Sequence, residues 1–221
     1  MHWQNLLKKA QKIGLSPGNV LSYLSLKAMD AMWGVSTLSF YCKAALLGVR
    51  LGKNVRCHGS VGLLRWPSGT ITIGNNVSFI SSWRRATATT TFAPTRLRVF
   101  GTGAITIGDG CELTATSITA RSTEISLGKN VLIGPNSVIV DSDFHAPWPP
   151  EERSINAGIE RDQAVHIDDY VWIGMQCIIL KGVHIGKGAI IGAGSVVTHD
   201  IAPNTVACGV PARSISDSRP G

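Results

Sequence analysis

His145 lies between two aspartates and a tryptophan, in the stretch DSDFHAPW that covers residues 141–148. An imidazole titrates near neutral pH, so it can take the proton of an attacking hydroxyl group as a general base. If the chain is extended here, Asp143 projects on the same side as His145 and could hold the ring in one tautomer. Asp141 is a second candidate for that role. The sequence predicts that His145 and Asp143 are catalytic.

A period of six residues dominates the second half of the chain. An aliphatic residue recurs at Ile167, Ile173, Ile179, Ile185, Ile191 and Val197. The residue four positions after each of these is mostly small or β-branched: Val171, Cys177, Val183, Ala189, Ser195 and Ile201. Earlier units, each with glycine after the aliphatic residue, begin at Leu51, Ile73, Ile107, Leu127 and Ile133. A period of six matches neither a helix face nor simple strand alternation, so each unit is predicted to be a short strand followed by a turn.

These units predict an all-β fold in which three of them form one coil of a parallel β-helix. Stacked coils pair their backbones about 4.7–4.9 Å apart and align the aliphatic residues inside. We expect the β-helix at residues 51–215, after an N-terminal extension at 1–50 and before a tail at 216–221. The repeat breaks near 81–97 and near 140–166. Long loops in solenoids usually carry function, and His145 lies at the start of the second one.

The remaining histidines are predicted to have no catalytic or metal-binding role. His166 and His184 each precede an inward aliphatic residue, so alternation directs them outward. His145, His166, His184 and His199 are 21, 18 and 15 residues apart, whereas converging zinc ligands on such a prism would include a pair five residues apart. We expect no metal site.

The N-terminal extension is basic and partly apolar. Two short amphipathic helices are expected, at Asn5–Ile13 and Asn19–Met32, and they could cap the first coil. The first of them carries Lys8, Lys9 and Lys12, a pattern that suits peripheral contact with an anionic membrane. The uncharged run Ala31–Cys42 is too short to cross a bilayer, and no secretory signal is evident, so we expect a cytoplasmic protein.

The distribution of charge and the cysteine content limit the partners and the redox state that we expect. The net charge is +7, and the first fifty residues hold six of the basic groups against one acidic group, a local excess of 6 − 1 = +5. Motifs for nucleic-acid binding are lacking, so no nucleic-acid partner is expected. The five cysteines are scattered and odd in number, which favours reduced thiols.

The chain resembles the hexapeptide-repeat acyltransferases over roughly Leu51 to Ile215. The strings VWIG at 171–174, GVHIG at 182–186, GAGSVVT at 192–198 and CGVPAR at 208–213 are similar to those of maltose, galactoside and nodulation-factor O-acetyltransferases and of polysaccharide O-acetyltransferases. The resemblance implies a left-handed β-helix, a homotrimer, acetyl-CoA bound between adjacent prisms as co-substrate, and His145 as the base.

The same resemblance places the donor on the C-terminal coils. The implied donor-binding residues are Trp172, Gly174, Met175, Ala193, Thr198, His199, Pro211 and Arg213. Many relatives carry lysine where His199 stands, and a neutral imidazole attracts phosphate less strongly than an ammonium group. Lys181, Lys187 or Arg213 could compensate.

The acceptor is expected to be a sugar. Arg84 and Arg85 in the first loop and Trp148 in the second are the candidate contacts, and the arginines would suit an acidic or phosphorylated sugar. The favoured activity is O-acetylation of a glycan in surface polysaccharide or lipopolysaccharide biosynthesis. The alternatives are N-acetylation of an amino sugar and a β-helical scaffold without catalytic activity.

Overall fold

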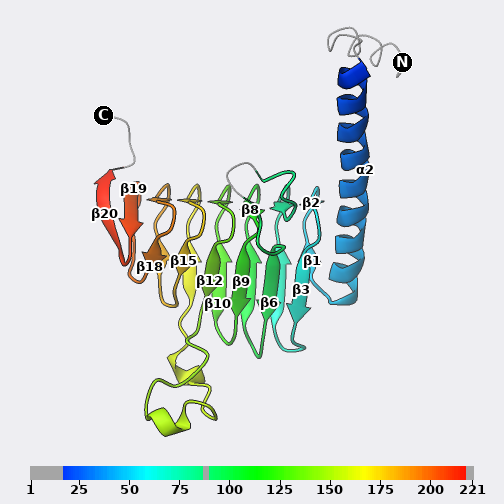
Figure 1. Cartoon of the computed structure of the whole chain (residues 1–221). Coiled ribbons are helices and arrows are strands. Elements are labelled where there is room, and N and C mark those ends of the chain that lie inside the picture. Colours follow the sequence, from blue (N-terminus) through cyan, green and yellow to red (C-terminus); the bar gives the residue numbers. More distant parts are fainter. Residues whose placement is uncertain (1–16, 87–89, 218–221) are drawn as a thin grey trace.

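A parallel β-helix forms most of the molecule in the computed structural model, which describes residues 17–86 and 90–217. Three sheets, parallel except at the last strand of the chain, make the faces of an elongated prism, with one long helix at its N-terminal end (Figure 1). This confirms the all-β prediction. Among the described residues, no helix is both long and apolar enough to span a bilayer.

Each sheet takes every third strand of the winding up to β18, and the last two strands both extend the second sheet. The first sheet contains β1 (Arg50–Leu51), β4 (Thr70–Ile73), β7 (Ala104–Ile107), β10 (Glu124–Leu127), β13 (Val165–Ile167) and β16 (His184–Ile185). The second contains β2 (Arg56–His58), β5 (Ser78–Ile80), β8 (Glu112–Thr114), β11 (Leu132–Ile133), β14 (Trp172–Ile173), β17 (Ile190–Ile191), β19 (Thr205–Gly209) and β20 (Ala212–Asp217). The third contains β3 (Gly62–Arg65), β6 (Arg96–Val99), β9 (Ser117–Ala120), β12 (Val138–Val140), β15 (Ile178–Ile179) and β18 (Val196–Val197).

The aliphatic residue of each repeat points into the prism and stacks on its counterpart in the next coil. In the first sheet, Ile107 pairs with Leu127, Leu127 with Ile167, and Ile167 with Ile185. All four are at most 2% exposed. At the corners, asparagines such as Asn76 and Asn130 adopt positive φ angles of 57° and 55°, a conformation that asparagine tolerates better than most residues.

Both ends of the prism are covered. At the start, α2 (Pro17–Leu46) buries Phe40 and Ala44 against the first coils, and the Phe40 ring lies 5.5 Å from that of Phe79. At the other end, β20 folds back antiparallel onto β19. Because an open coil end would expose core residues and unpaired strand edges, these two elements act as caps.

Two boundaries differ from those expected. The helix expected at Asn19–Met32 is one continuous helix to Leu46, because its last turns carry the apolar residues that cover the first coil. β20 continues to Asp217, into the expected tail, because Val206 and Thr205 pair with its last two residues. The helix expected at Asn5–Ile13 and the basic residues Lys8, Lys9 and Lys12 lie outside the described residues.

Candidate functional site

The loop that holds His145 leaves the third sheet after β12 and enters the first sheet at β13. It contains two short 3-10 helices, η1 (Pro150–Glu152) and η2 (Ile159–Arg161), and projects from the edge between these two sheets (Figure 1). Its first residue, Asp141, is fully buried. The Asp141 carboxylate accepts hydrogen bonds from the backbone N–H groups of Arg121, Ser122 and Thr123 at 2.8–3.1 Å. Asp141 therefore anchors the loop and does not face the histidine.

The end of the loop is fixed by an ion pair between Arg121 and Asp162. The Arg121 Nη2 nitrogen lies 2.6 Å from Asp162 Oδ1, and the two side chains are 11% and 1% exposed. Burial raises the pKa of Asp162, but hydrogen bonds from Arg121 and Ser122 outweigh it, so the pKa is lowered overall. Arg121 Nη2 also donates to the carbonyl oxygen of Gly158. The loop is thus held at both ends.

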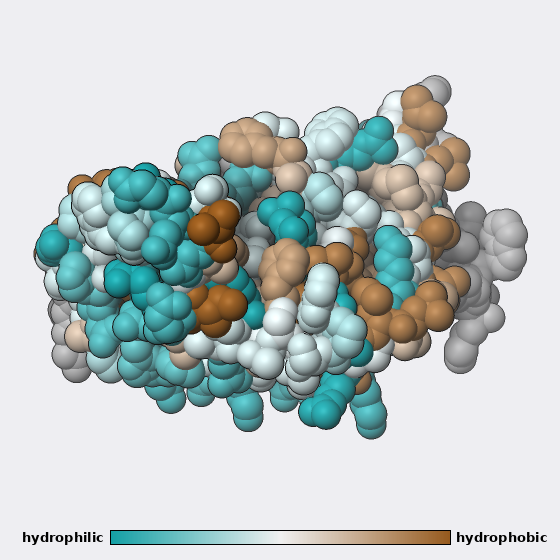
Figure 2. All heavy atoms as spheres, turned by 90° about the horizontal axis from the view of Figure 1, so that it is seen from below, coloured by the Kyte–Doolittle hydropathy of each residue, from teal (hydrophilic) through white to brown (hydrophobic). Residues whose placement is uncertain are grey.

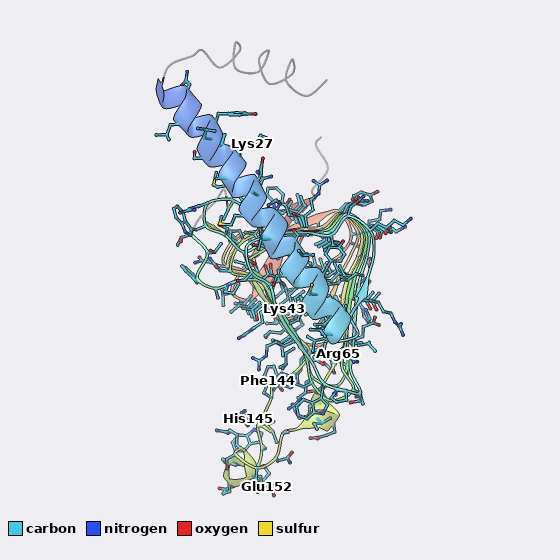
Figure 3. All side chains as sticks on the ribbon, turned by 90° about the vertical axis from the view of Figure 1, so that its right-hand side faces the viewer. Lys27, Lys43, Arg65, Phe144, His145 and Glu152 are labelled. Carbon is cyan, nitrogen blue, oxygen red and sulfur yellow. The ribbon has the colours of Figure 1, made fainter. Side chains whose placement is uncertain are left out.

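His145 is exposed on this loop, and a main-chain group holds its ring. The Nδ1 nitrogen lies 2.8 Å from the carbonyl oxygen of Arg153. A carbonyl oxygen can only accept, so this contact assigns the proton of the neutral ring to Nδ1 and leaves the Nε2 lone pair free. Figure 3 shows His145 and Glu152 in the loop that projects from the β-helix. The arrangement suits a general base.

Asp143 does not orient the ring as expected. The residue between them, Phe144, has a φ of 64°, so the chain is not extended and the two side chains lose the common side that alternation would give. The Asp143 carboxylate forms an ion pair with Lys181 and lies 4.0 Å from the Nε nitrogen of Arg161. Asp143 ties the loop to the β-helix.

The predicted acceptor residues are spread over two edges of the prism. Trp148 is 74% exposed in the His145 loop. Arg84 and Arg85 lie between β5 and β6, at the edge between the second and third sheets, on the other side of the prism (Figure 1). Their guanidinium groups lie over the rings of Trp83 at 5.3 Å and Trp33 at 5.8 Å. Within one chain, the structure does not bring these arginines to His145.

Four predicted donor residues line one hollow of about 510 Å³ on the second sheet. These residues are Trp172, Gly174, Met175 and Ala193. Trp172 is 54% exposed, which confirms that it points out of the prism. A Cβ atom on Gly174 would lie 2.6 Å from the backbone nitrogen of Ala193, so only glycine permits this close stacking of the two turns.

The hollow also contains residues that sequence reasoning missed. Glu112 and Leu132 line it; Leu132 pairs with Trp172 on the next strand, and Glu112 pairs with Leu132 on the strand before. The repeat in the sequence indicates that Glu112 and Leu132 point outward. It does not indicate which strands lie beside theirs, because the phase of the repeat shifts between blocks.

The other predicted donor residues gather at the C-terminal end. His199 and Arg213 line a second hollow of about 390 Å³, where Thr198 Oγ1 lies 2.8 Å from His199 Nδ1. Pro211 is exposed in the turn between β19 and β20. Of the three basic residues expected to compensate for His199, Arg213 lines this hollow, whereas Lys181 is bonded to Asp143.

A third hollow, of about 470 Å³, lies beside the His145 loop and was not anticipated. Its lining includes Trp66, Phe100, Arg121 and Ile159. Trp66 is 55% exposed and Ile159 56% exposed, so an apolar surface is open next to the loop. Their proximity depends on the coil stacking, and no local motif indicated it.

The outward prediction for His166 and His184 is confirmed. Both are exposed, with His166 Nδ1 2.8 Å from Ser126 Oγ and His184 Nε2 3.0 Å from Asp168 Oδ1. Among the residues that the structure describes, no group of three histidine, cysteine or acidic side chains could hold a metal ion. All five cysteines are free, and burial raises the pKa of the Cys57 thiol to about 12.

Comparison with known proteins agrees with this geometry. Residues 164–199 match the family model described as bacterial transferase hexapeptide (six repeats). These hexapeptide repeats form the C-terminal coils of the prism, and the fold is a left-handed β-helix.

Several individual proteins are similar to this chain in sequence or in fold. A Schizosaccharomyces pombe protein, provisionally named an acetyltransferase, is 48% identical over 41% of this chain and 42% of its own length. The galactoside O-acetyltransferase of Lactococcus lactis is 39% identical over 54% of this chain and 57% of its own length. The chain thus spans about half the length of these relatives. AntD, an N-acyltransferase from Bacillus cereus, has the same fold, with a TM-score of 0.60, 22% identity, and coverage of 80% of this chain and 87% of its own.

Proposed function

We propose that this protein transfers an acetyl group from acetyl-CoA to a hydroxyl group of a sugar, with His145 as the general base. The observation that carries the proposal is the contact between His145 Nδ1 and the Arg153 carbonyl, which leaves Nε2 able to accept a proton. The similarity to galactoside O-acetyltransferases supports the type of reaction.

The reaction follows from the chemistry of the two partners. Nε2 takes the proton of the acceptor hydroxyl as its oxygen attacks the thioester carbonyl. The tetrahedral intermediate collapses, the C–S bond breaks, and the protonated imidazole returns the proton to the departing thiolate. The ring is neutral again, and no covalent acyl-enzyme is formed.

The donor is proposed to lie along the hollow lined by Trp172 and Ala193 and to extend toward His199 and Arg213. The first region is mostly apolar and contains glycine turns that stack closely, which suits the pantetheine arm. The second contains the guanidinium group of Arg213, which suits phosphate.

This arrangement requires more than one copy of the chain. His145 projects from the edge between the first and third sheets, whereas the Trp172 hollow lies on the second sheet, opposite that edge. We propose a homotrimer in which the loop of one copy reaches the donor hollow of the next. A ring of heterologous interfaces supplies this relationship three times.

The composite site has a sharp test in mixed assemblies. His145→Ala removes the base but keeps the hollow, and Ala193→Trp fills the hollow but keeps the base. When the two variants are co-assembled in equal amounts, about one interface in four should combine both intact halves and regain activity. Activity no greater than the sum of the parents, in trimers shown by mass to be mixed, would place the site within one copy.

The acceptor is proposed to be a glycan of surface polysaccharide or lipopolysaccharide assembly, met in the cytoplasm. Exposed Trp148 and the open hollow at Trp66 offer aromatic faces near the loop on which a sugar can stack. An amine acceptor would use the same base. Mass spectrometry of products from sugars and their amino-sugar counterparts, each with acetyl-CoA, distinguishes O- from N-acetylation. No transfer to either class would contradict the proposed function.

A further inference from the structure

An apolar stripe runs along the outer face of α2. Its members are aliphatic or small, all are exposed, and they follow one another at alternating steps of three and four residues: Leu21, Leu24, Ala28, Ala31, Val35, Leu38, Cys42 and Ala45. The four large members are 56–70% exposed. Alternating steps of three and four make the heptad pattern by which one helix packs on another.

The opposite face of α2 holds the helix against the prism. Phe40 and Ala44 are buried there. Thr37 Oγ1 accepts a hydrogen bond from the Cys57 backbone N–H at 3.0 Å, and the Tyr41 hydroxyl accepts one from Val55 at 3.1 Å. The stripe therefore faces away from the β-helix. Figure 3 looks onto this outer side of α2, and Figure 2 shows hydrophobic side chains gathered at the same end of the molecule.

We propose that the stripe is an interface whose partner is α2 of a second copy, packed antiparallel about a twofold axis near Trp33 and Gly34. A twofold contact uses the same surface on both copies, so the stripe must be complementary to itself. The prisms would lie on opposite sides of the helix pair, since each covers the other face of its own helix.

The sizes of the side chains select the antiparallel orientation. In that register Leu21 meets the partner's Ala45, Leu24 meets the partner's Cys42, Ala28 meets the partner's Leu38, and Ala31 meets the partner's Val35. Every layer thus joins one large and one small side chain, the combination that fills a helix interface without voids. A parallel pair would stack leucine on leucine and alanine on alanine, with gaps at the alanine layers.

A second copy fits the stripe better than a lipid surface does. Large apolar side chains and flanking cations strengthen binding of a helix to a lipid surface, whereas alternation of large and small residues does not. The helix has three charged residues, Lys27, Asp30 and Lys43, and none lies on the stripe. Small residues at the middle, Ala28, Ala31 and Gly34, let two helix backbones approach closely.

The pairing does not depend on the proposed acetyl transfer. If the chain is a trimer, pairs of α2 would join two trimers end to end into a hexamer, because the stripe faces outward along the prism. If the chain is otherwise a monomer, it would be a dimer.

Cross-linking tests the register directly. Leu24→Cys places a new thiol opposite the partner's Cys42, so diamide, which oxidises two thiols to a disulfide, should convert the full-length chain into a covalent dimer. Peptide mapping should find the bond between positions 24 and 42. The matched control is Leu26→Cys, on the same helix and 55% exposed but off the stripe, which should give no such dimer. A bond between the two copies of position 24 would overturn the antiparallel arrangement.

Charge insertion tests the interface itself. Leu24→Glu with Leu38→Glu should halve the mass measured by sedimentation, while Leu26→Glu should leave it unchanged. Both variants should keep the circular dichroism of the parent, since all three leucines are exposed. Unchanged mass in the double variant overturns the proposal. The same holds if the double variant keeps its mass and loses only binding to phosphatidylglycerol vesicles, because the stripe would then be a membrane surface.

Discussion

The Nδ1 nitrogen of His145 lies 2.8 Å from the carbonyl oxygen of Arg153, eight residues further along the same loop. A main-chain carbonyl cannot be titrated or removed by substituting its side chain. The orientation of the ring therefore depends on the fold of the loop, and the clamp between Arg121 and Asp162 becomes important for the site.

Replacing the base tests its role. His145→Ala should lower the turnover number by about 10²–10⁴, equivalent to about 3–5 kcal/mol of barrier, because proton removal assists only the transition state. Acetyl-CoA affinity, measured by calorimetry, should stay nearly constant. His166→Ala, an exposed histidine outside the loop, is the control and should keep full turnover. A folded His145→Ala enzyme with normal turnover would exclude this residue as the base.

Breaking the clamp should loosen the loop. Asp162→Asn leaves Arg121 buried without its charged partner, which typically costs about 3–5 kcal/mol. We expect faster amide hydrogen exchange across residues 141–164 and a lower turnover number. If amide hydrogens throughout the loop exchange in Asp162→Asn at the wild-type rate, the ion pair does not hold the loop.

The same pair should make stability depend on acid. The pKa of Asp162 is lowered in the folded chain, so its carboxylate stabilises the fold above the unfolded value near 3.8. This contribution should be lost as the pH falls below that value and through the lower folded pKa. In urea titrations between pH 5 and pH 2.5, the wild type should lose more stability than Asp162→Asn. Parallel curves would show that the pair contributes no pH dependence.

Filling the donor hollow should affect one substrate only. Ala193→Trp should raise the Michaelis constant for acetyl-CoA, because a large side chain occupies the proposed path of the pantetheine arm. The Michaelis constant for the sugar should change little. Ala93→Trp, an exposed alanine in another loop, is the matched control. Ordinary acetyl-CoA kinetics in Ala193→Trp would move the donor elsewhere.

Removing the N-terminal cap should destabilise the β-helix. Phe40 is 2% exposed against Phe79, so Phe40→Ala should lower the free energy of unfolding by about 3–5 kcal/mol. Leu46→Ala, on the same helix and 87% exposed, should have little effect. Equal stabilities in thermal unfolding would mean that the helix does not cap the coil.

The repeat in the sequence determined the architecture of this protein. Aliphatic residues at every sixth position, such as Ile167 and Ile185, have one arrangement that buries them all, which is stacked coils with turns between the strands. The breaks in that period located both loops, and His145 was found because it opens one of them. These features follow from local periodicity, which a single sequence contains.

The tertiary structure alone decided what surrounds His145. The positive φ of Phe144 interrupts the extended chain on which the expected pairing with Asp143 depended, and the return of the chain at Arg153 supplies the hydrogen bond to the ring. Arg121 and Asp162 are 41 residues apart and meet because successive coils stack in register. Such contacts depend on how the coils and the loop fold back on one another, and the spacing of residues along the chain does not encode them.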